Sequence, residues 1–151
     1  MKYALVVLCA LLVGCGGLTK EQQATAYNAA ANKYDSAVDA ANADYDAALD
    51  VATTDDEKLL AITDMYSTYA GIDRIFADAL AEISWTSDFS VTAERLADCV
   101  NETYLLEIEV LAATELQEAI DLATTADDND ASCDLIADEL KAALGLEGAT
   151  E

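Results

Sequence analysis

The sequence predicts an all-α protein, an elongated up-down-up bundle of three long helices followed by a short fourth C-terminal helix. Two features of composition favour helix. The 151 residues contain no proline and only six glycines, and alanine, the residue with the highest helix propensity, is abundant. The third observation is periodicity, because apolar residues recur every three or four positions over long stretches. Together these features predict one helical domain over residues 19–145.

The first helix is predicted to begin after Thr19. Thr19 and Gln22 have the spacing of a capping box, in which each side chain accepts a hydrogen bond from the other's backbone N–H. The apolar positions that follow fall within one narrow sector of a helix and are Tyr27, Ala31, Tyr34, Val38, Ala41, Tyr45, Leu49 and Ala52. This apolar stripe predicts a rod roughly 50 Å long.

The second helix is predicted to begin near residue 55, because Thr54 and Glu57 repeat the capping-box spacing. Its apolar stripe consists of Leu59, Ile62, Met65, Tyr69, Ile72, Phe76, Leu80 and Ile83. We expect the first two helices to form an antiparallel hairpin. Residues 84–90 interrupt the pattern with short polar side chains around Trp85. Trp85 either closes the end of the bundle, which is the commoner role of a single tryptophan, or contacts a membrane surface.

A third long helix is predicted over residues 91–124. Its apolar stripe consists of Leu96, Val100, Thr103, Leu106, Val110, Ala113, Leu116 and Ile120. Residues 125–130 predict a loop, and a short final helix follows over residues 131–144, with Gly145 at its C-terminal cap. The tail at residues 146–151 is expected to fray. The same apolar stripes would also serve coiled-coil pairing between copies of the chain.

The first fifteen residues carry a targeting signal. Lys2 precedes an apolar run whose length suits a secretory signal and is too short to span a bilayer. The run ends in Leu12-Val13-Gly14-Cys15, which resembles the lipobox of bacterial lipoproteins. The resemblance covers the N-terminus alone. It implies that residues 1–14 are removed as a signal peptide, that Cys15 is acylated, and that residues 15–18 form a lipidated tether.

The resemblance also implies a location in the cell envelope, where the N-terminal lipid holds the protein to a membrane. In such lipoproteins an Asp directly after the cysteine favours retention at the inner membrane, and here that position is Gly16. We therefore expect the outer membrane, facing the periplasm, in a cell with two membranes. In other cells we expect the outer face of the cytoplasmic membrane.

Cys99 and Cys133 leave three outcomes open. An exported protein meets an oxidising compartment, which favours a disulfide. If the helix predicted over residues 91–124 is continuous, however, Cys99 lies roughly 38 Å from its end, and the link from there to Cys133 spans about 30 Å at most. Either the helix breaks and folds back so that the two cysteines bond, or both thiols stay free, or they pair between molecules.

An acidic segment near the C-terminus matches part of an EF-hand loop. Asp128, Asp130, Ser132, Asp134 and Glu139 stand at positions one, three, five, seven and twelve of such a loop, but Cys133 replaces the glycine expected at position six. The alternative is an acidic loop before a helix N-terminus, where the helix dipole favours Asp. Calcium is the one cofactor for which the sequence offers ligands, and these five residues are the candidates.

The chain has no histidine, which removes the commonest general base and the nucleophile pairs built on it. We therefore assign no catalytic residue and expect a protein that is not an enzyme. An acid-pair hydrolase is the enzymatic alternative, and it would need a concave site that holds a carboxyl group with a raised pKa.

The charge of the chain limits its partners. Without residues 1–14, all 30 acidic residues stand against six basic ones, a net charge of about −24. This charge excludes nucleic acid as a partner, because the phosphate backbone is repelled, and it favours basic proteins and cations.

A lipobox and long Ala-rich helices are features that the chain shares with murein-type lipoproteins, although it ends in Glu151 and not in the lysine that such proteins link to peptidoglycan. We therefore expect an acyl-anchored structural spacer, scaffold or protein-binding rod, whose protein partner is another protein or a second copy. The alternative is a binding or inhibitory lipoprotein that captures a basic protein, of the kind that some phages encode to exclude incoming DNA.

Overall fold

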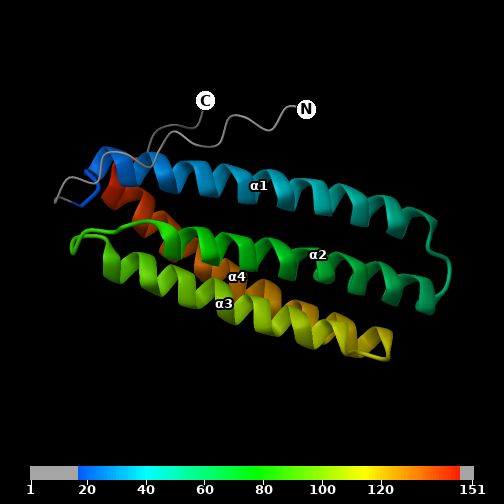
Figure 1. Cartoon of the computed structure of the whole chain (residues 1–151). Coiled ribbons are helices and arrows are strands. Elements are labelled where there is room, and N and C mark those ends of the chain that lie inside the picture. Colours follow the sequence, from blue (N-terminus) through cyan, green and yellow to red (C-terminus); the bar gives the residue numbers. More distant parts are fainter. Residues whose placement is uncertain (1–16, 147–151) are drawn as a thin grey trace, which may run out of the picture.

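The computed structural model describes residues 17–146, which form four α-helices and no strand. These are α1 (Lys20–Val51), α2 (Asp55–Glu82), α3 (Ser90–Leu111) and α4 (Leu116–Leu144). Consecutive helices run in opposite directions along one another (Figure 1), and each packs on the next, whereas α1 approaches α4 over only a short stretch. The predicted all-α class is therefore confirmed. In the described part of the chain, no helix is long and apolar enough to cross a bilayer.

The first two helices begin as predicted. At the start of α1, the Gln22 N–H donates to the Thr19 hydroxyl (3.3 Å) and the Thr19 N–H donates to the Gln22 side-chain oxygen (2.9 Å). Thr54 and Glu57 form the same capping box at the start of α2. The Glu57 carboxylate also accepts hydrogen bonds from Thr53, and together these contacts lower the pKa of Glu57 to about 2. A short turn then joins α1 to α2 as an antiparallel hairpin (Figure 1).

The predicted lengths of the third and fourth helices are wrong. The third helix ends at Leu111 and not near residue 124, and after a turn at residues 112–115 the chain folds back into a fourth helix that is long. The physical reason is burial. Folding back places Val110 and Ala119 in one apolar cluster, where both are fully buried, whereas a straight helix would hold them about 13 Å apart.

The loop predicted over residues 125–130 is also wrong, because this segment belongs to α4. Its polar residues have modest intrinsic helix propensity, but tertiary packing overrides it, and Ala126 is buried against the neighbouring helices. The Thr125 hydroxyl donates to the carbonyl oxygen of Asp121 within the helix, at 3.1 Å. The helix predicted over residues 131–144 is the C-terminal part of α4, and Gly145 ends it in the left-handed conformation (φ 77°), as predicted.

Polar contacts close the end of the bundle at which α1 begins. Gln23 is fully buried, its side-chain N–H donates to the carbonyl oxygen of Leu18 (2.7 Å), and its side-chain oxygen accepts from the Thr86 N–H (3.2 Å). Trp85 is half-buried against the apolar cluster at this end, and its indole N–H donates to the carbonyl oxygen of Leu80 (2.9 Å). Trp85 thus packs on the end of the bundle, and its contact with a membrane surface stays a prediction.

The core consists of two apolar clusters that follow one another along the bundle. The cluster near the start of α1 contains, among others, Tyr27, Leu80, Leu96 and Leu140. The cluster near the far end contains Ile62, Tyr66, Val110, Ala119 and Ala126. On α2 and α3, the buried polar residues Asp73, Thr103 and Glu107 lie in sequence between the members of the two clusters. We call these three residues the polar layer.

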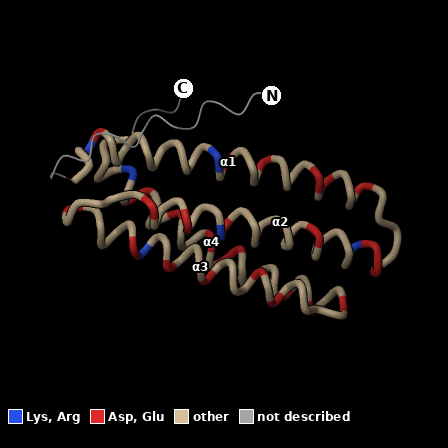
Figure 2. The backbone as a smooth tube through the Cα atoms, in the orientation of Figure 1, with Lys and Arg blue, Asp and Glu red and all other residues tan. Residues whose placement is uncertain are grey.

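Acidic residues occur along all four helices, whereas basic residues are few (Figure 2). Residues 17–146 form three ion pairs: Lys58 with Asp55, Arg95 with Glu139, and Lys141 with Asp138. All three pairs are exposed, so each stabilises the fold by about 1 kcal/mol at most. Most acidic residues of this part of the chain therefore have no basic partner.

Candidate functional site

A cavity of about 270 Å³ lies at the polar layer and has walls from all four helices. Five of its lining residues are acidic: Asp73 from α2, Glu107 from α3, and Asp127, Asp130 and Asp134 from α4. The other polar residues of the wall are Tyr34 and Asn42 of α1, Tyr69 of α2 and Thr103 of α3. No lining residue is Lys or Arg. We call this space the acidic cavity.

Asp73 and Glu107 are the innermost acidic residues of this cavity. Each is only 3% exposed. One carboxylate oxygen of each, Oδ2 of Asp73 and Oε2 of Glu107, is buried with no hydrogen-bond partner in the described part of the chain. An ionised carboxylate in such a position is unfavourable unless a positive charge or a hydrogen-bond donor compensates it.

The cavity raises the pKa of three of its carboxyl groups, those of Asp73, Glu107 and Asp130. Burial, followed by the charge of Asp130, raises the pKa of Asp73 to about 7. Burial, followed by the charges of Asp73, Asp130 and Asp127, raises the pKa of Glu107 to about 9. Burial and the neighbouring Asp134 raise the pKa of Asp130 as well. At neutral pH the cavity therefore holds protons that a cationic ligand can displace.

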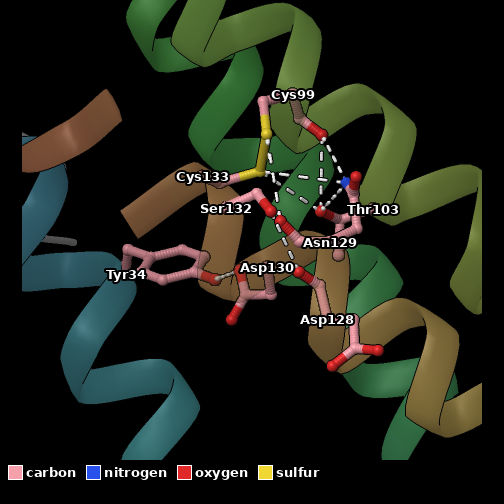
Figure 3. The surroundings of a disulfide bond; sticks show 8 residues. All are labelled: Tyr34, Cys99, Thr103, Asp128, Asn129, Asp130, Ser132 and Cys133. Carbon is pink, nitrogen blue, oxygen red and sulfur yellow. Dashed lines mark hydrogen bonds between the residues drawn. A yellow bond between two sulfur atoms is a disulfide. The ribbon is translucent and has the colours of Figure 1, made fainter. Parts of the chain in front are cut away.

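Tyrosine hydroxyls position two of the aspartates on α4. The Tyr34 hydroxyl reaches from α1 toward Asp130 (Figure 3) and donates to its carboxylate at 3.5 Å. The Tyr66 hydroxyl donates from α2 to the carboxylate of Asp127 at 2.6 Å. The wall that α4 contributes is thus held from two neighbouring helices.

A disulfide fixes α4 against α3 beside the cavity (Figure 3). Cys99 and Cys133 are bonded, so of the three outcomes left open by the sequence the structure has the first, in which the chain folds back. The Asn129 side-chain amide donates to the Thr103 hydroxyl (3.0 Å) and to the carbonyl oxygen of Cys99 (3.3 Å). Cys133 lies about one turn from Asp130 and directly precedes Asp134 on α4, and the bond therefore sets the position of the acidic wall.

We expect the double variant Cys99→Ala/Cys133→Ala to lose about 3–4 kcal/mol of unfolding free energy, because the bond closes a long loop in the unfolded chain. The two cysteines are 34 residues apart. Urea unfolding of the full chain measures the loss. A reductant should lower the stability of the wild type by a similar amount and leave the double variant unchanged. Equal stability of the oxidised wild type and the double variant would contradict the expectation.

A second cavity of about 460 Å³ continues from the acidic cavity toward the far end of the bundle. The two cavities share Asn42, Tyr69 and Asp127 as lining residues. The Tyr69 hydroxyl donates to the Asn42 side-chain oxygen at 2.5 Å across this junction. The second cavity is lined also by Tyr45 and Asp46 of α1. We call the two cavities together the acidic groove. It follows α1 from Tyr34 to Asp46, roughly 18 Å of helix.

The five candidate calcium ligands do not form an EF-hand loop, because all of them lie on α4. Residues 128 and 139 are about 16 Å apart along a helix axis. Asp130 and Asp134 line the acidic cavity, Glu139 forms an exposed ion pair, and the Ser132 hydroxyl donates to the backbone carbonyl of Asp128. Within residues 17–146, no three acidic or cysteine side chains are grouped to hold one metal ion. Cys15 lies outside the described residues.

Asp73 and Glu107 are not among the residues that the sequence motifs indicate. Asp73 lies three residues after Ala70 and four before Ala77, and both alanines are buried. Glu107 lies likewise four residues after Thr103 and three before Val110, which are also buried. Both acidic residues therefore occupy core positions of their helices. An acidic residue at a core position of a helix is the signal that identifies such a site. An analysis that considers only the apolar residues of a helix does not identify such a position.

Comparison with known protein families, curated proteins and solved structures gives no match to this chain.

Proposed function

We propose that the chain is an acyl-anchored, acidic lipoprotein of the cell envelope whose helical body is a binding module for a cationic group. The lipobox-like ending at Cys15 supports the anchor, and with it the location at the outer membrane facing the periplasm or at the outer face of the cytoplasmic membrane. One observation carries the binding role. Asp73 and Glu107 are buried, each with an unpaired oxygen, at a cavity whose five acidic residues have no basic neighbour in its wall.

A protonated amine or a guanidinium group matches this cavity, because it supplies both positive charge and N–H donors. Such a group belongs to a free amine or to a side chain of a basic protein partner. A structural spacer or scaffold would need no ionisable groups inside the bundle, where burying them costs stability. The cavity therefore favours the binding role over the purely structural one.

The same cavity meets the condition that an acid-pair hydrolase sets, a concave site with a carboxyl group of raised pKa. We rank this second, because a neutral sugar would leave the charges of the cavity uncompensated, whereas a cation neutralises them. Turnover of chromogenic glycosides that is lost in Glu107→Gln would support hydrolysis. The absence of turnover by the full chain would leave binding as the function.

Calorimetric titration of the full chain with butylamine tests the binding role. We expect saturable heat from butylamine and none from butanol, which has the same shape without the charge. The double variant Asp73→Asn/Glu107→Gln should weaken butylamine binding by about tenfold, or about 1.4 kcal/mol. If neither butylamine nor a lysine amide produces saturable heat, the proposed function is wrong.

A further inference from the structure

The acidic groove is longer than a single amine requires. It combines the acidic cavity with the second cavity, and the two are joined at Asn42, Tyr69 and Asp127. The second cavity, about 460 Å³, is within the size range of small-molecule sites, and the acidic cavity, about 270 Å³, is slightly below it. The groove opens beside α1 because that helix packs along α2 and approaches α4 over only a short stretch.

The negative charge of the groove is spread along its length. Asp134 lies toward one end, Asp73, Glu107 and Asp130 lie at the middle, and Asp46 lies toward the other end. On α4 alone, residues 127 and 134 are about 10 Å apart along the helix axis. One ammonium group donates hydrogen bonds over only about 3 Å, so a single amine cannot reach all of these carboxylates. Neither cavity has Lys or Arg in its lining.

Apolar and aromatic surface lies between the charges. Val38 lines the acidic cavity, Ile62 and Met65 line the second cavity, and Tyr45 and Tyr69 contribute rings to the second cavity. Methylene chains gain from contact with such side chains, and ammonium groups gain from contact with tyrosine rings. Carboxylates separated by apolar and aromatic side chains match a flexible chain in which ammonium groups alternate with methylenes.

We propose that the acidic groove binds a linear polyamine, with one ammonium group between Asp73, Glu107 and Asp130 and another toward Asp46. This inference rests on the proposed function, since it names the class of cation that the site takes. The buried, unpaired carboxylates of Asp73 and Glu107 receive the inner ammonium group, and the length of the groove selects a chain with several charges over a monoamine.

Titration of the full chain with spermidine, butylamine and calcium chloride at physiological ionic strength tests the proposal. We expect spermidine to bind at least about tenfold more tightly than butylamine, because it reaches carboxylates that butylamine does not, and tenfold corresponds to about 1.4 kcal/mol. Asp73→Asn/Glu107→Gln should weaken both amines. Asp46→Asn should weaken spermidine and leave butylamine unchanged, because Asp46 lines the second cavity alone.

Asp78→Asn/Glu109→Gln is the matched control. It replaces the same two residue types on the same two helices, at exposed positions that line neither cavity, and it should retain spermidine binding. Equal weakening by the two double variants would overturn the proposal in favour of general charge attraction. If Asp73→Asn/Glu107→Gln fails to fold, Asp130→Asn, at a half-buried position, replaces it.

The outcomes separate this inference from the proposed function. Butylamine binding without any preference for spermidine overturns the polyamine class and leaves the binding of a cationic group in place. Saturable calcium binding that spermidine does not displace overturns the polyamine class in favour of a metal ion. The absence of saturable binding by either amine overturns both the inference and the proposed function.

Discussion

Cys15→Ala is expected to abolish the attachment of fatty acid to the chain and to release it from the membrane fraction. In lipoproteins with a lipobox, the acyl chain is attached at the cysteine thiol, and alanine offers no such group. The wild type should incorporate labelled palmitate, the variant should fall to background, and residues 1–14 should stay attached to the variant. We expect complete loss of both labelling and membrane association, because the lipid is the only anchor that the sequence predicts.

Cys9→Ala is the matched control for this experiment. Cys9 lies in the same apolar run but follows Leu8, whereas Cys15 follows the small residue Gly14. The control should therefore keep the label and the membrane location. Recovery of the wild-type chain with Met1 in place and without fatty acid would contradict the anchor, and so would labelling that depends on Cys9.

The first half of the fold follows from local signals in the sequence. Thr19 with Gln22, and Thr54 with Glu57, form the two capping boxes that their spacing predicts. The apolar stripe of the first helix correctly includes Tyr27 and Ala41, which are buried. These signals act between residues that are close in sequence, so no knowledge of the tertiary structure is needed to use them.

The turn between α3 and α4 is harder to predict, because the apolar pattern continues through it without a break. Its local signal is weak. Thr114 donates its backbone N–H to the Glu118 carboxylate at 3.1 Å, and the N-cap residue, Glu115, makes no side-chain capping bond. The stronger signal for the turn is the pair Cys99 and Cys133, which lie on either side of it in the sequence. A bond between Cys99 and Cys133 is incompatible with one continuous helix, and the disulfide that an oxidising compartment favours therefore requires a break between them.

The candidate site depends still more on tertiary structure. Asp130 and Asp134 are singled out by their spacing in sequence, yet they line a cavity with residues of other helices and not with Asp128 or Glu139. Asp73 and Glu107 face one cavity only because α2 and α3 pack with a particular register, which no local pattern specifies. The distance in sequence between the members of this site is the reason that motif analysis does not find it.

Raising the pH from about 5 to about 9 is expected to lower the unfolding free energy of the full chain by on the order of 8 kcal/mol. The folded-state pKa lies about two pH units above 5 for Asp73 and about four units above 5 for Glu107, and each unit corresponds to about 1.4 kcal/mol. Folding raises the pKa of Asp73 from 3.8 to about 7 and that of Glu107 from 4.5 to about 9. Between these values the folded chain binds more protons than the unfolded chain. The stability is therefore fully present below about pH 4 and is lost as the pH rises through 7 and then 9.

The surroundings of the two carboxyl groups fix the sign of this effect. The groups that line the same cavity are Tyr34 from α1, Tyr69 from α2, and Asp127, Asp130 and Asp134 from α4. None of these groups carries a positive charge, so none stabilises the negative charges that form when Asp73 and Glu107 lose their protons. Urea unfolding at pH 5, 7 and 9 measures the slope, and stability that is constant or rises over this range would contradict it.

The double variant Asp73→Asn/Glu107→Gln should flatten the dependence of stability on pH, because an amide has the shape of the protonated acid and cannot ionise. It should match the wild type only below about pH 4, exceed it slightly at pH 5 and exceed it most at pH 9. General repulsion among the many surface carboxylates has the same sign, and Asp78→Asn/Glu109→Gln separates the two causes, since it replaces the same two residue types at exposed positions. If the slope comes from the buried pair, this control keeps nearly all of it. If both double variants flatten the slope equally, surface repulsion and not the cavity controls the pH dependence.

A saturating concentration of spermidine should also raise the stability at pH 9. It should stabilise Asp73→Asn/Glu107→Gln by about 1.4 kcal/mol less than the control variant, because a ligand stabilises the folded chain in proportion to how tightly it binds and tenfold weaker binding corresponds to that difference.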